Sequence, residues 1–572
     1  MPSEPNRLAF SAPPGPSQRR HQRQRRHLLP AVVLVLCIFL FGMIEASGSG
    51  SDASQVVQRY VHDWQRGHYA DMYRLLSHSS QSGLSERAFA AQLDAAASTA
   101  SLTALRPERI ISLNGSLAEV EIKLTTRVFG NLNERLQLTL DSSDSSKVRI
   151  TFTPAAVLPG LRPGESLRRT AVLGQRGSLL FADGTMMASG STLASSQWNL
   201  AQNIAGTLEP IPASEQAQFA ALGYPSTAKV GADGLEAVYQ ESLAGRPGGV
   251  LYAGRRVLAR AQPVNGATIK TSISPNLESA SVQALDNRLG GITVMSPTGA
   301  IEAAAGIAFT DLQPPGSTFK IITSTAALAA GLTSINKVYP MTANANIGGY
   351  TLNNAGGEVC GGTLLNAFAT SCNSTFAPIG VEVGAQRLVS MAERYGFNAP
   401  VAGIPTASIS TIPSAATIGG ATAIGSSAIG QGMVQASTLQ MADVAATIAD
   451  HGRRPLPTFL DNAKARYMPV TSAKIAAEIQ KMMIAVVESP DGTGTTAQIT
   501  GVTIAGKTGT AELKSTGTQQ NDTKATDAWF VAYAPADNPK VIACALFPNA
   551  GYGAATAAPA VSAVIEAALG LR

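Results

Sequence analysis

The sequence contains few charged residues, few aromatic residues and little cysteine. Of its 572 residues, 14% are charged and 5% are aromatic, whereas 45% are hydrophobic. This composition excludes a highly charged disordered chain, and the length predicts several domains rather than one core. The four cysteines form no CxxC pair, and the six histidines lack the spacing of metal ligands. A disulfide-rich framework and a zinc site are therefore not expected.

The excess of basic over acidic residues lies in one short segment. Residues 1–27 contain six Arg and one Glu, and the remaining chain has equal numbers of basic and acidic residues. The basic pI therefore indicates no nucleic-acid partner. The sequence also lacks the phosphate-binding pattern GxxxxGK[ST], and no cofactor is expected.

An uncharged apolar run covers residues 28–44, directly after the arginine cluster. As a helix it would be about 25 Å long, near the lower limit for crossing a bilayer. Because basic flanks stay in the cytoplasm, we expect a cytoplasmic tail (1–27), a single-pass plasma-membrane anchor (28–44) and an extracytoplasmic remainder. The alternative is a cleaved signal peptide, but this run is longer than a usual h-region of about 7–15 residues.

A serine and a lysine three residues apart, Ser317 and Lys320, open a strongly apolar predicted helix and share one face of it. A serine hydroxyl is a weak nucleophile unless a base removes its proton. A lysine can be that base when burial and a nearby positive charge lower its pKa. The SxxK pattern alone is not decisive, since it also occurs at Ser226 and Ser334.

Two further motifs follow Ser317. Ser371-Cys372-Asn373 comes after a short predicted helix over residues 364–370, and Lys507-Thr508-Gly509 follows an apolar run that predicts a strand. KTG occurs once in the chain. With SxxK, SxN and KTG in this order, the region from about Ile292 onward resembles the penicillin-binding protein transpeptidases of the serine β-lactamase superfamily.

The resemblance implies four catalytic residues. Ser317 would attack the carbonyl carbon of a D-Ala-D-Ala peptide bond to form an acyl-enzyme, and Lys320 would accept its proton. Ser371 would relay a proton to the departing amine, because a hydroxyl both donates and accepts. Lys507 would keep Lys320 neutral and attract the substrate carboxylate.

The resemblance also implies four substrate-binding residues. Asn373 would hold the amide of the acyl chain, and Thr508 and Thr510 would bind the substrate carboxylate. Gly509 lacks a Cβ, which would let the strand approach the substrate backbone. The backbone N–H groups of Ser317 and Thr510 would form the oxyanion hole.

The predicted fold class is α+β with several domains. Residues 51–159 show helical periodicity followed by alternating strands, and they resemble the NTF2-like domain of some penicillin-binding proteins. Residues 160–285 resemble the linker or dimerisation region of class B penicillin-binding proteins. Residues 286–572 are expected to form the transpeptidase domain, an antiparallel sheet flanked by helices as in serine β-lactamases.

The implied function is that of a class B penicillin-binding protein. It would cross-link the stem peptides of peptidoglycan as a D,D-transpeptidase and be a target of β-lactams. Its expected partners include a glycosyltransferase or membrane proteins of the division or elongation machinery. A class D-like β-lactamase and a D,D-carboxypeptidase are the alternative enzymes. A non-enzymatic β-lactam sensor is disfavoured by the short cytoplasmic tail.

The sequence argues against a disulfide between Cys360 and Cys372. The predicted helix between them would rise about 10 Å over seven residues, whereas a disulfide needs Cα atoms within about 7 Å. Cys372 is therefore interpreted as a small filler. Cys544 is expected to be a buried thiol on a strand, and residues 529–533 are expected to form a core strand.

Overall fold

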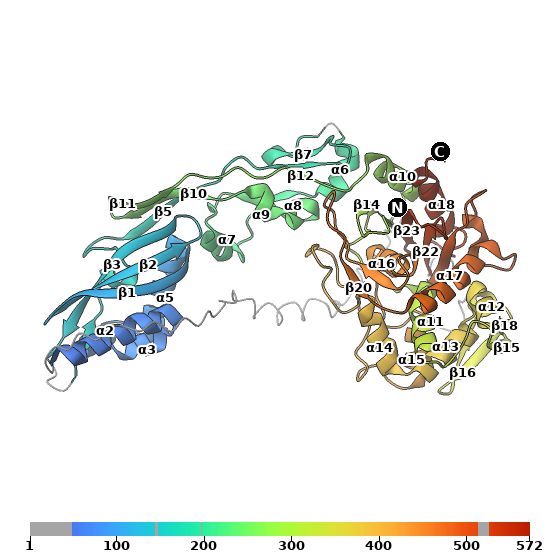
Figure 1. Cartoon of the computed structure of the whole chain (residues 1–572), viewed down its shortest axis with the longest axis horizontal. Coiled ribbons are helices and arrows are strands. Elements are labelled where there is room, and N and C mark those ends of the chain that lie inside the picture. The colour runs from blue at the N-terminus through green and yellow to red at the C-terminus, as the bar shows by residue number, and fades with distance from the viewer. Residues whose placement is uncertain (1–48, 144–146, 196, 513–525, 572) are drawn as a thin grey trace, which may run out of the picture.

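The computed structural model describes residues 49–143, 147–195, 197–512 and 526–571. Figure 1 shows an N-terminal domain and a larger C-terminal domain at opposite ends of a linker region. The predicted cytoplasmic tail and membrane anchor lie outside the described residues. Within the described ranges, no helix combines the length and hydropathy needed to cross a membrane.

The N-terminal domain packs four helices against an antiparallel sheet. The helices are α2 (Ser49–Arg66), α3 (Tyr69–Arg74), α4 (His78–Gly83) and α5 (Glu86–Ala100), and the strands are β1 (Leu102–Asn114), β2 (Leu117–Thr126), β3 (Gly130–Asp141) and β4 (Arg149–Thr151). They pair in the order β1-β2-β3-β4. Gly67, with a φ of 71°, separates the first two helices, and the Ser85 side chain caps α5.

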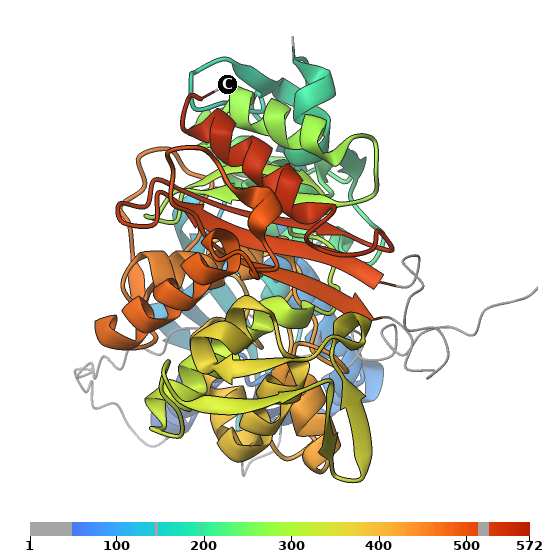
Figure 2. The ribbon, with the colours of Figure 1, turned by 90° about the vertical axis from the view of Figure 1, so that its right-hand side faces the viewer.

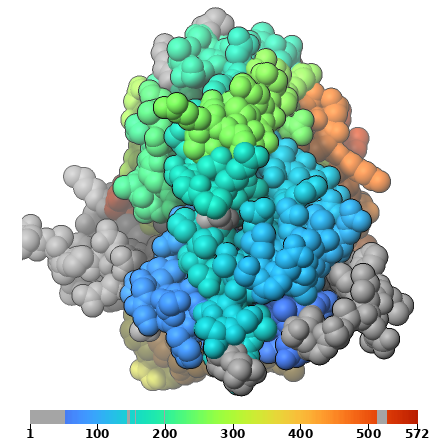
Figure 3. Space-filling model, turned by 90° about the vertical axis from the view of Figure 1, so that its left-hand side faces the viewer, coloured from blue at the N-terminus to red at the C-terminus, as the bar shows by residue number. Residues whose placement is uncertain are grey.

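The hydrophobic core of this domain is built from the helices and from the alternating buried residues of β2, and it also includes Leu251, Ala253 and Ala259 of the linker region. Figure 3 shows the surface of this domain in blue and cyan, beside the green surface of the linker region. The structure thus contains the small α+β unit predicted near residues 51–159. Its likeness to NTF2-like domains stays a prediction.

The linker region contains short strands and helices. Its strands are β5 (Leu167–Val172), β6 (Ser178–Leu180), β7 (Met186–Ser189), β8 (Leu208–Pro210), β9 (Lys229–Gly231), β10 (Gly248–Ala253), β11 (Arg256–Ala261) and β12 (Ile269–Lys270), and its helices are α6 (Trp198–Ala205), α7 (Gln216–Leu222), α8 (Gly234–Val238) and α9 (Gln240–Ala244). The buried Arg176 donates through Nε to the Glu236 carboxylate over 2.8 Å. This ion pair joins the start of β6 to α8, which lies 60 residues later in the chain.

The C-terminal domain is built on an antiparallel sheet in the order β14-β13-β23-β22-β21. The strands are β13 (Gly291–Met295), β14 (Ile301–Gly306), β21 (Ala505–Glu512), β22 (Thr526–Ala534) and β23 (Val541–Phe547). Helices α10 (Pro275–Leu285) and α18 (Ala557–Ala568) cover one face, and α16 (Thr438–Ala449) and α17 (Ala473–Glu488) cover the other (Figure 2). The predicted antiparallel sheet flanked by helices is confirmed.

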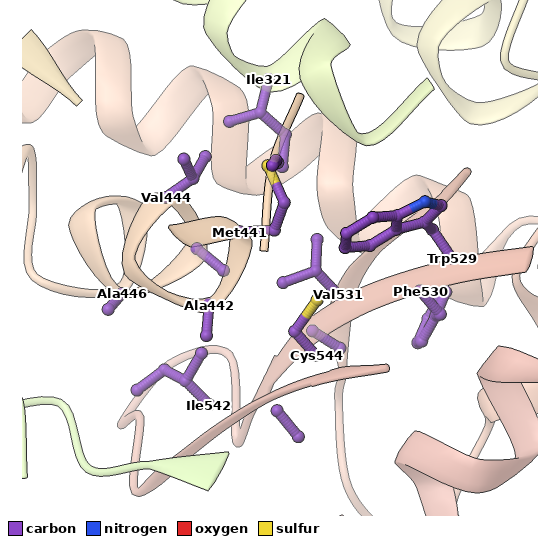
Figure 4. Close-up of a cluster of buried hydrophobic side chains, with 14 of the residues drawn as sticks. Ile321, Met441, Ala442, Val444, Ala446, Trp529, Phe530, Val531, Ile542 and Cys544 are labelled. Atoms are coloured by element: carbon purple, nitrogen blue, oxygen red, sulfur yellow. The ribbon is translucent and has the colours of Figure 1, made fainter. Parts of the chain in front are cut away.

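Both faces of the central strands are buried, which explains their continuous apolar runs. Figure 4 shows Met441 of α16 and Ile321 close to Val531 and Cys544 of the sheet. Val531 and Cys544 are cross-strand partners. The predictions of a core strand at residues 529–533 and of a buried thiol at Cys544 are confirmed.

A second, mainly helical part of this domain, formed by residues 316–428, lies below the sheet in Figure 2. A 3₁₀ turn (Gly316–Phe319) leads into α11 (Lys320–Ala329), and the other elements are α12 (Leu364–Ala369), α13 (Asn373–Val383), α14 (Ala385–Arg394), α15 (Ala421–Ala428), β15 (Val338–Thr342), β16 (Asn344–Ile347), β17 (Tyr350–Asn353) and β18 (Cys360–Thr363). Helix α11 packs against α13, α14 and α17, so its first turn is held between the helical part and the sheet.

The expectation about Cys360 and Cys372 is wrong, because the two residues form a disulfide with a Cα–Cα distance of 5.7 Å. The rise of the helix alone does not set the distance between the two cysteines, because a strand precedes the helix. Strand β18 covers about 10–13 Å before α12, which covers about 9 Å in return. When a strand and a helix run in opposite directions over similar lengths, the residues at their far ends meet.

Removal of this disulfide is expected to lower thermal stability. A cross-link that closes a loop of this size stabilises a domain by about 3 kcal/mol through the unfolded state. The Cys360→Ala/Cys372→Ala variant of the full chain should therefore show a lower unfolding midpoint in calorimetry. Non-reducing peptide mapping should find the linked pair in the wild-type protein. Two free thiols in that map, together with an unchanged midpoint, would contradict the assignment.

Candidate active site

A cleft of about 900 Å³ lies between the helical part and the edge of the sheet. It brings together five of the eight predicted site residues, which come from segments up to 193 residues apart: Ser317, Ser371, Asn373, Thr508 and Thr510. Lys320 and Lys507 are fully buried beneath it. Gly509 does not line the cleft but lies on the same strand, β21.

Ser317 sits half-buried in the 3₁₀ turn, one residue after Gly316. Gly316 has a φ of 53°, which favours glycine, and its N–H donates to the Gly430 carbonyl over 2.9 Å. A Cβ on Gly316 would lie 2.8 Å from the Thr510 carbonyl oxygen. The serine is therefore held by close backbone contacts with two segments from later in the chain.

Lys320 begins α11, and its side-chain nitrogen reaches the second motif, Ser371-Cys372-Asn373. Lys320 Nζ donates to the Ser371 carbonyl over 2.6 Å and to Asn373 Oδ1 over 2.8 Å, and it lies 3.4 Å from Ser371 Oγ. Lys507 Nζ approaches the same hydroxyl from the sheet and donates to Ser371 Oγ over 2.8 Å. Ser371 Oγ thus bridges the two lysines, as a proton relay requires.

Burial lowers the pKa values of both lysines, and the charge on Lys507 lowers that of Lys320 further. The pKa of Lys320 falls well below its usual value, first because of desolvation and second because of the charge on Lys507. Burial also lowers the pKa of Lys507, to about 7. These shifts fit the expected roles, in which Lys320 is a neutral base and Lys507 carries the positive charge, and both roles stay predictions.

The rate of acylation is expected to depend on pH in a bell-shaped manner. Acid protonates Lys320, which removes the base, and alkali above a pH of about 7 removes the charge on Lys507. The pH profile of the second-order acylation rate by a β-lactam would show both limbs for the free enzyme. Lys507→Arg should move the alkaline limb upward, because a guanidinium group keeps its proton. An alkaline limb that does not move would contradict this assignment to Lys507.

The second motif adopts an unusual backbone conformation. Ser371 has a φ of 58°, in the left-handed region that is uncommon for residues other than glycine. Such strain persists where surrounding contacts hold it, and here the Ser371 carbonyl accepts from Lys320 and the next residue is disulfide-bonded. Asn373 begins α13 and donates through Nδ2 to the Asn353 carbonyl over 3.2 Å.

The hydroxyls of Thr508, in the third motif Lys507-Thr508-Gly509, and of Thr510, just after it, contact residues that were not predicted as site residues. Thr508 Oγ1 lies 2.6 Å from Thr493 Oγ1, and the backbone N–H of Thr493 donates to the Ala369 carbonyl. Thr510 Oγ1 accepts from the Gly553 N–H over 3.4 Å. Thr493 lies in the turn at residues 491–495, which the sequence presents only as a Gly/Thr-rich segment, so no sequence signal identifies its role.

The structure gives a packing reason for the missing side chain of Gly509. A Cβ there would lie 2.8 Å from the Pro315 carbonyl oxygen and 3.0 Å from Thr318 Cγ2. The missing side chain therefore lets β21 pack against the turn that carries Ser317. The expected approach of this strand to a substrate backbone stays a prediction.

Potential metal ligands do not gather at the cleft. In the part of the chain that the structure describes, one trio of such groups lies together, and it consists of Asp63, His68 and Asp71 in the N-terminal domain. The cleft is lined by hydroxyl, amide and apolar groups and by one carboxylate, that of Glu358. Its geometry suits serine nucleophilic chemistry that uses side chains alone.

Comparison with known families agrees with this geometry. Residues 280–566 match the family described as the penicillin binding protein transpeptidase domain, which is half of the chain. The chain belongs to this family. Residues 195–271 match the penicillin-binding protein dimerisation domain, so the protein is of class B. That second match falls within the linker region predicted at residues 160–285.

Several named relatives share the C-terminal half. The peptidoglycan D,D-transpeptidase PbpA of Mycobacterium tuberculosis is 36% identical over 287 residues, covering 46% of this chain and 56% of the relative. PbpA of Mycolicibacterium smegmatis is 34% identical over 289 residues, with the same coverage. This penicillin-binding protein thus spans about half the length of the curated relatives it matches.

Solved structures resemble a larger share of the chain. The D,D-transpeptidase domain of a peptidoglycan glycosyltransferase from Eggerthella lenta has a TM-score of 0.56 and 25% identity, covering 70% of this chain and 99% of that one. Penicillin-binding protein A of M. tuberculosis, solved as a ceftriaxone acyl-enzyme complex, has a TM-score of 0.55 and 25% identity, covering 69% and 98%.

Proposed function

We propose that this penicillin-binding protein is a peptidoglycan D,D-transpeptidase and a target of β-lactams. The observation that carries the proposal is the pair of buried lysines joined through Ser371 Oγ behind the cleft that contains Ser317. Such a pair supplies a neutral base and, below a pH of about 7, a positive charge in one site. The D,D-transpeptidase names of its relatives and the acyl-enzyme complex of a related structure support the same activity.

Acylation begins with transfer of the Ser317 hydroxyl proton to neutral Lys320. Ser317 Oγ forms a bond to the carbonyl carbon of the D-Ala-D-Ala peptide, and the backbone N–H groups of Ser317 and Thr510 stabilise the oxyanion. As the C–N bond breaks, the proton passes from Lys320 through Ser371 Oγ to the departing amine. The products are an acyl-enzyme and free D-alanine, and Lys320 is neutral again.

Substrate binding follows from the position of β21 at the end of the described sheet order. An edge strand has free N–H and C=O groups and can pair with an extended peptide. Thr508 and Thr510 line the cleft on this strand, and both would donate to the terminal carboxylate. Lys507 lies directly below them and contributes its positive charge.

The acyl-enzyme is expected to be long-lived after labelling with penicillin, which separates a transpeptidase from a class D-like β-lactamase. A class D enzyme needs a carbamylated lysine, which persists in apolar surroundings. Here the Ser371 carbonyl and Asn373 Oδ1 both accept from Lys320 Nζ, and such polar surroundings favour an ammonium group, which donates to both oxygens, over an anionic carbamate. The measurement is the loss of labelled acyl-enzyme after excess β-lactam is removed. Persistence for hours is expected, and turnover within seconds that bicarbonate stimulates would contradict the proposal.

A D,D-carboxypeptidase would form the same acyl-enzyme and would pass the acyl group to water. Assay of the chain on pentapeptide substrate with and without an added amine distinguishes the two activities. We propose that the amine product dominates.

We also propose a single-pass plasma-membrane anchor at residues 28–44 with an extracytoplasmic catalytic domain. Residues 51–159 are proposed to have an NTF2-like fold, and division or elongation proteins are the proposed partners.

A further inference from the structure

One charged side chain lines the active-site cleft in the part of the chain that the structure describes, and it is that of Glu358. Its carboxylate is exposed, and no described residue forms an ion pair with it. The mechanism above does not use this residue. A negative charge at this position needs an explanation, because the first substrate is itself an anion that Lys507 attracts.

The loop that carries Glu358 is fixed by the buried side chain of Asn354. Asn354 Nδ2 donates to the Glu358 carbonyl over 2.9 Å and to the Thr342 carbonyl over 2.8 Å. Asn354 Oδ1 accepts from the Ser374 N–H over 2.8 Å. One buried amide therefore joins the loop to the start of α13, directly beside the second motif.

Two further links fix the same loop on either side of Glu358. Before it, the Asn353 carbonyl accepts from Asn373 Nδ2. After it, Cys360 is bonded to Cys372, which lies between Ser371 and Asn373. Both ends of the loop are thus attached to the Ser371-Cys372-Asn373 motif, and these links hold the backbone of Glu358 at the wall of the cleft.

The charges of the site are separated in space. Lys507 lies buried below the cleft beside the threonines that would bind the donor carboxylate, whereas Glu358 lies exposed on its wall. The second substrate of a transpeptidase is a primary amine, which is a cation in water at neutral pH. The positive charge of Lys507 attracts the anionic donor and repels the cationic amine. The negative charge of Glu358 attracts the amine and repels the donor, so the two substrates are directed to different positions in the cleft.

We propose that Glu358 binds the ammonium group of the acyl acceptor, a primary amine on a second stem peptide, as it enters the cleft. This assignment rests on the transpeptidase function proposed above. The bound ammonium releases one proton to water, and the neutral amine nitrogen forms a bond to the acyl carbon. Lys320 takes the second proton and returns it to Ser317 Oγ as the ester C–O bond breaks.

The test measures how the acyl-enzyme divides between an amine and water. The full chain is acylated with a D-alanyl thioester donor, and N-acetyl-lysine amide, a cation, is compared with hydroxylamine, which is uncharged at neutral pH. Glu358→Gln should raise the half-saturating concentration of the cationic amine about five-fold at low ionic strength, since an exposed charge pair contributes an effect of this size. The difference should vanish at 1 M salt, and hydroxylamine should react equally with both proteins.

Glu382→Gln is the matched control, because Glu382 is an exposed carboxylate on α13 that does not line the cleft. It should leave the use of both amines unchanged. Glu358→Gln should also keep its penicillin labelling, which shows that the nucleophile and the fold are intact.

Three results would overturn the assignment. Equal use of the cationic amine by the wild type and Glu358→Gln refutes the role of Glu358 alone. Slower hydrolysis of the penicilloyl-enzyme in Glu358→Gln assigns the carboxylate to activation of water instead. A wild-type chain that is acylated but transfers its acyl group to neither amine refutes the transpeptidase function itself, and with it this inference.

Discussion

Replacement of Ser317 by alanine is expected to abolish labelling by a fluorescent penicillin. The label is retained through a covalent ester to the serine Oγ, and without that atom no ester forms. The turn around Ser317 is held by backbone contacts from Gly316 and Gly430. The variant should therefore keep its fold, and the loss of label should be complete while the unfolding midpoint is unchanged.

The other two SxxK serines provide matched controls. Ser226 and Ser334 are exposed and lie outside helices, so neither holds its lysine on a shared helical face. The Lys337 ammonium donates to the Leu332 carbonyl, away from Ser334. Ser226→Ala and Ser334→Ala should label like the wild type. Label that survives in Ser317→Ala and is lost in either control would refute the identity of the nucleophile.

Lys320→Arg is expected to lower the rate of acylation by at least about 100-fold, the smaller end of what a general base contributes. A guanidinium group keeps its proton and cannot accept the one from Ser317. Lys507→Arg should retain a measurable part of the rate, because Lys507 acts through its charge. The side chain is fully buried, so the larger guanidinium must fit among Ser371 and Thr508, and some loss is expected.

The measurement is the second-order rate of acylation by a chromogenic β-lactam, determined for both arginine variants at the same pH. Thermal unfolding of each variant shows that the fold is retained. Equal rates for the two variants would contradict the division of roles between a base and an electrostatic anchor. A faster rate in Lys320→Arg than in Lys507→Arg would reverse the assignment.

Local patterns in the sequence were sufficient to predict much of this structure. The apolar run after Lys320 predicts α11, and the run before Lys507 predicts the strand that carries the third motif. The order of the motifs, with KTG present once, distinguishes Ser317 from the other SxxK serines. These signals work because periodicity and motif order depend on residues that are close together in the chain.

Contacts between distant segments could not be predicted in this way. The disulfide depends on the directions of β18 and α12, and the position of Thr493 against Thr508 depends on how a turn after α17 meets β21. Glu358 carries no motif around it, and the fold alone places it in the cleft. The packing of Gly509 against Pro315 could not be predicted either, because sequence alone does not show which way a missing side chain would point.

The packing at Gly509 limits which substitutions could give resistance to a β-lactam. Glycines at 316, 430 and 509 let three backbone segments touch around Ser317, and any side chain there would displace the serine or its oxyanion hole. If the chain has the transpeptidase activity proposed above, a resistance substitution at these positions would remove that activity along with drug binding. Heritable tolerance to β-lactams is instead expected at exposed residues that line the cleft, such as Tyr350, Thr351 and Tyr552.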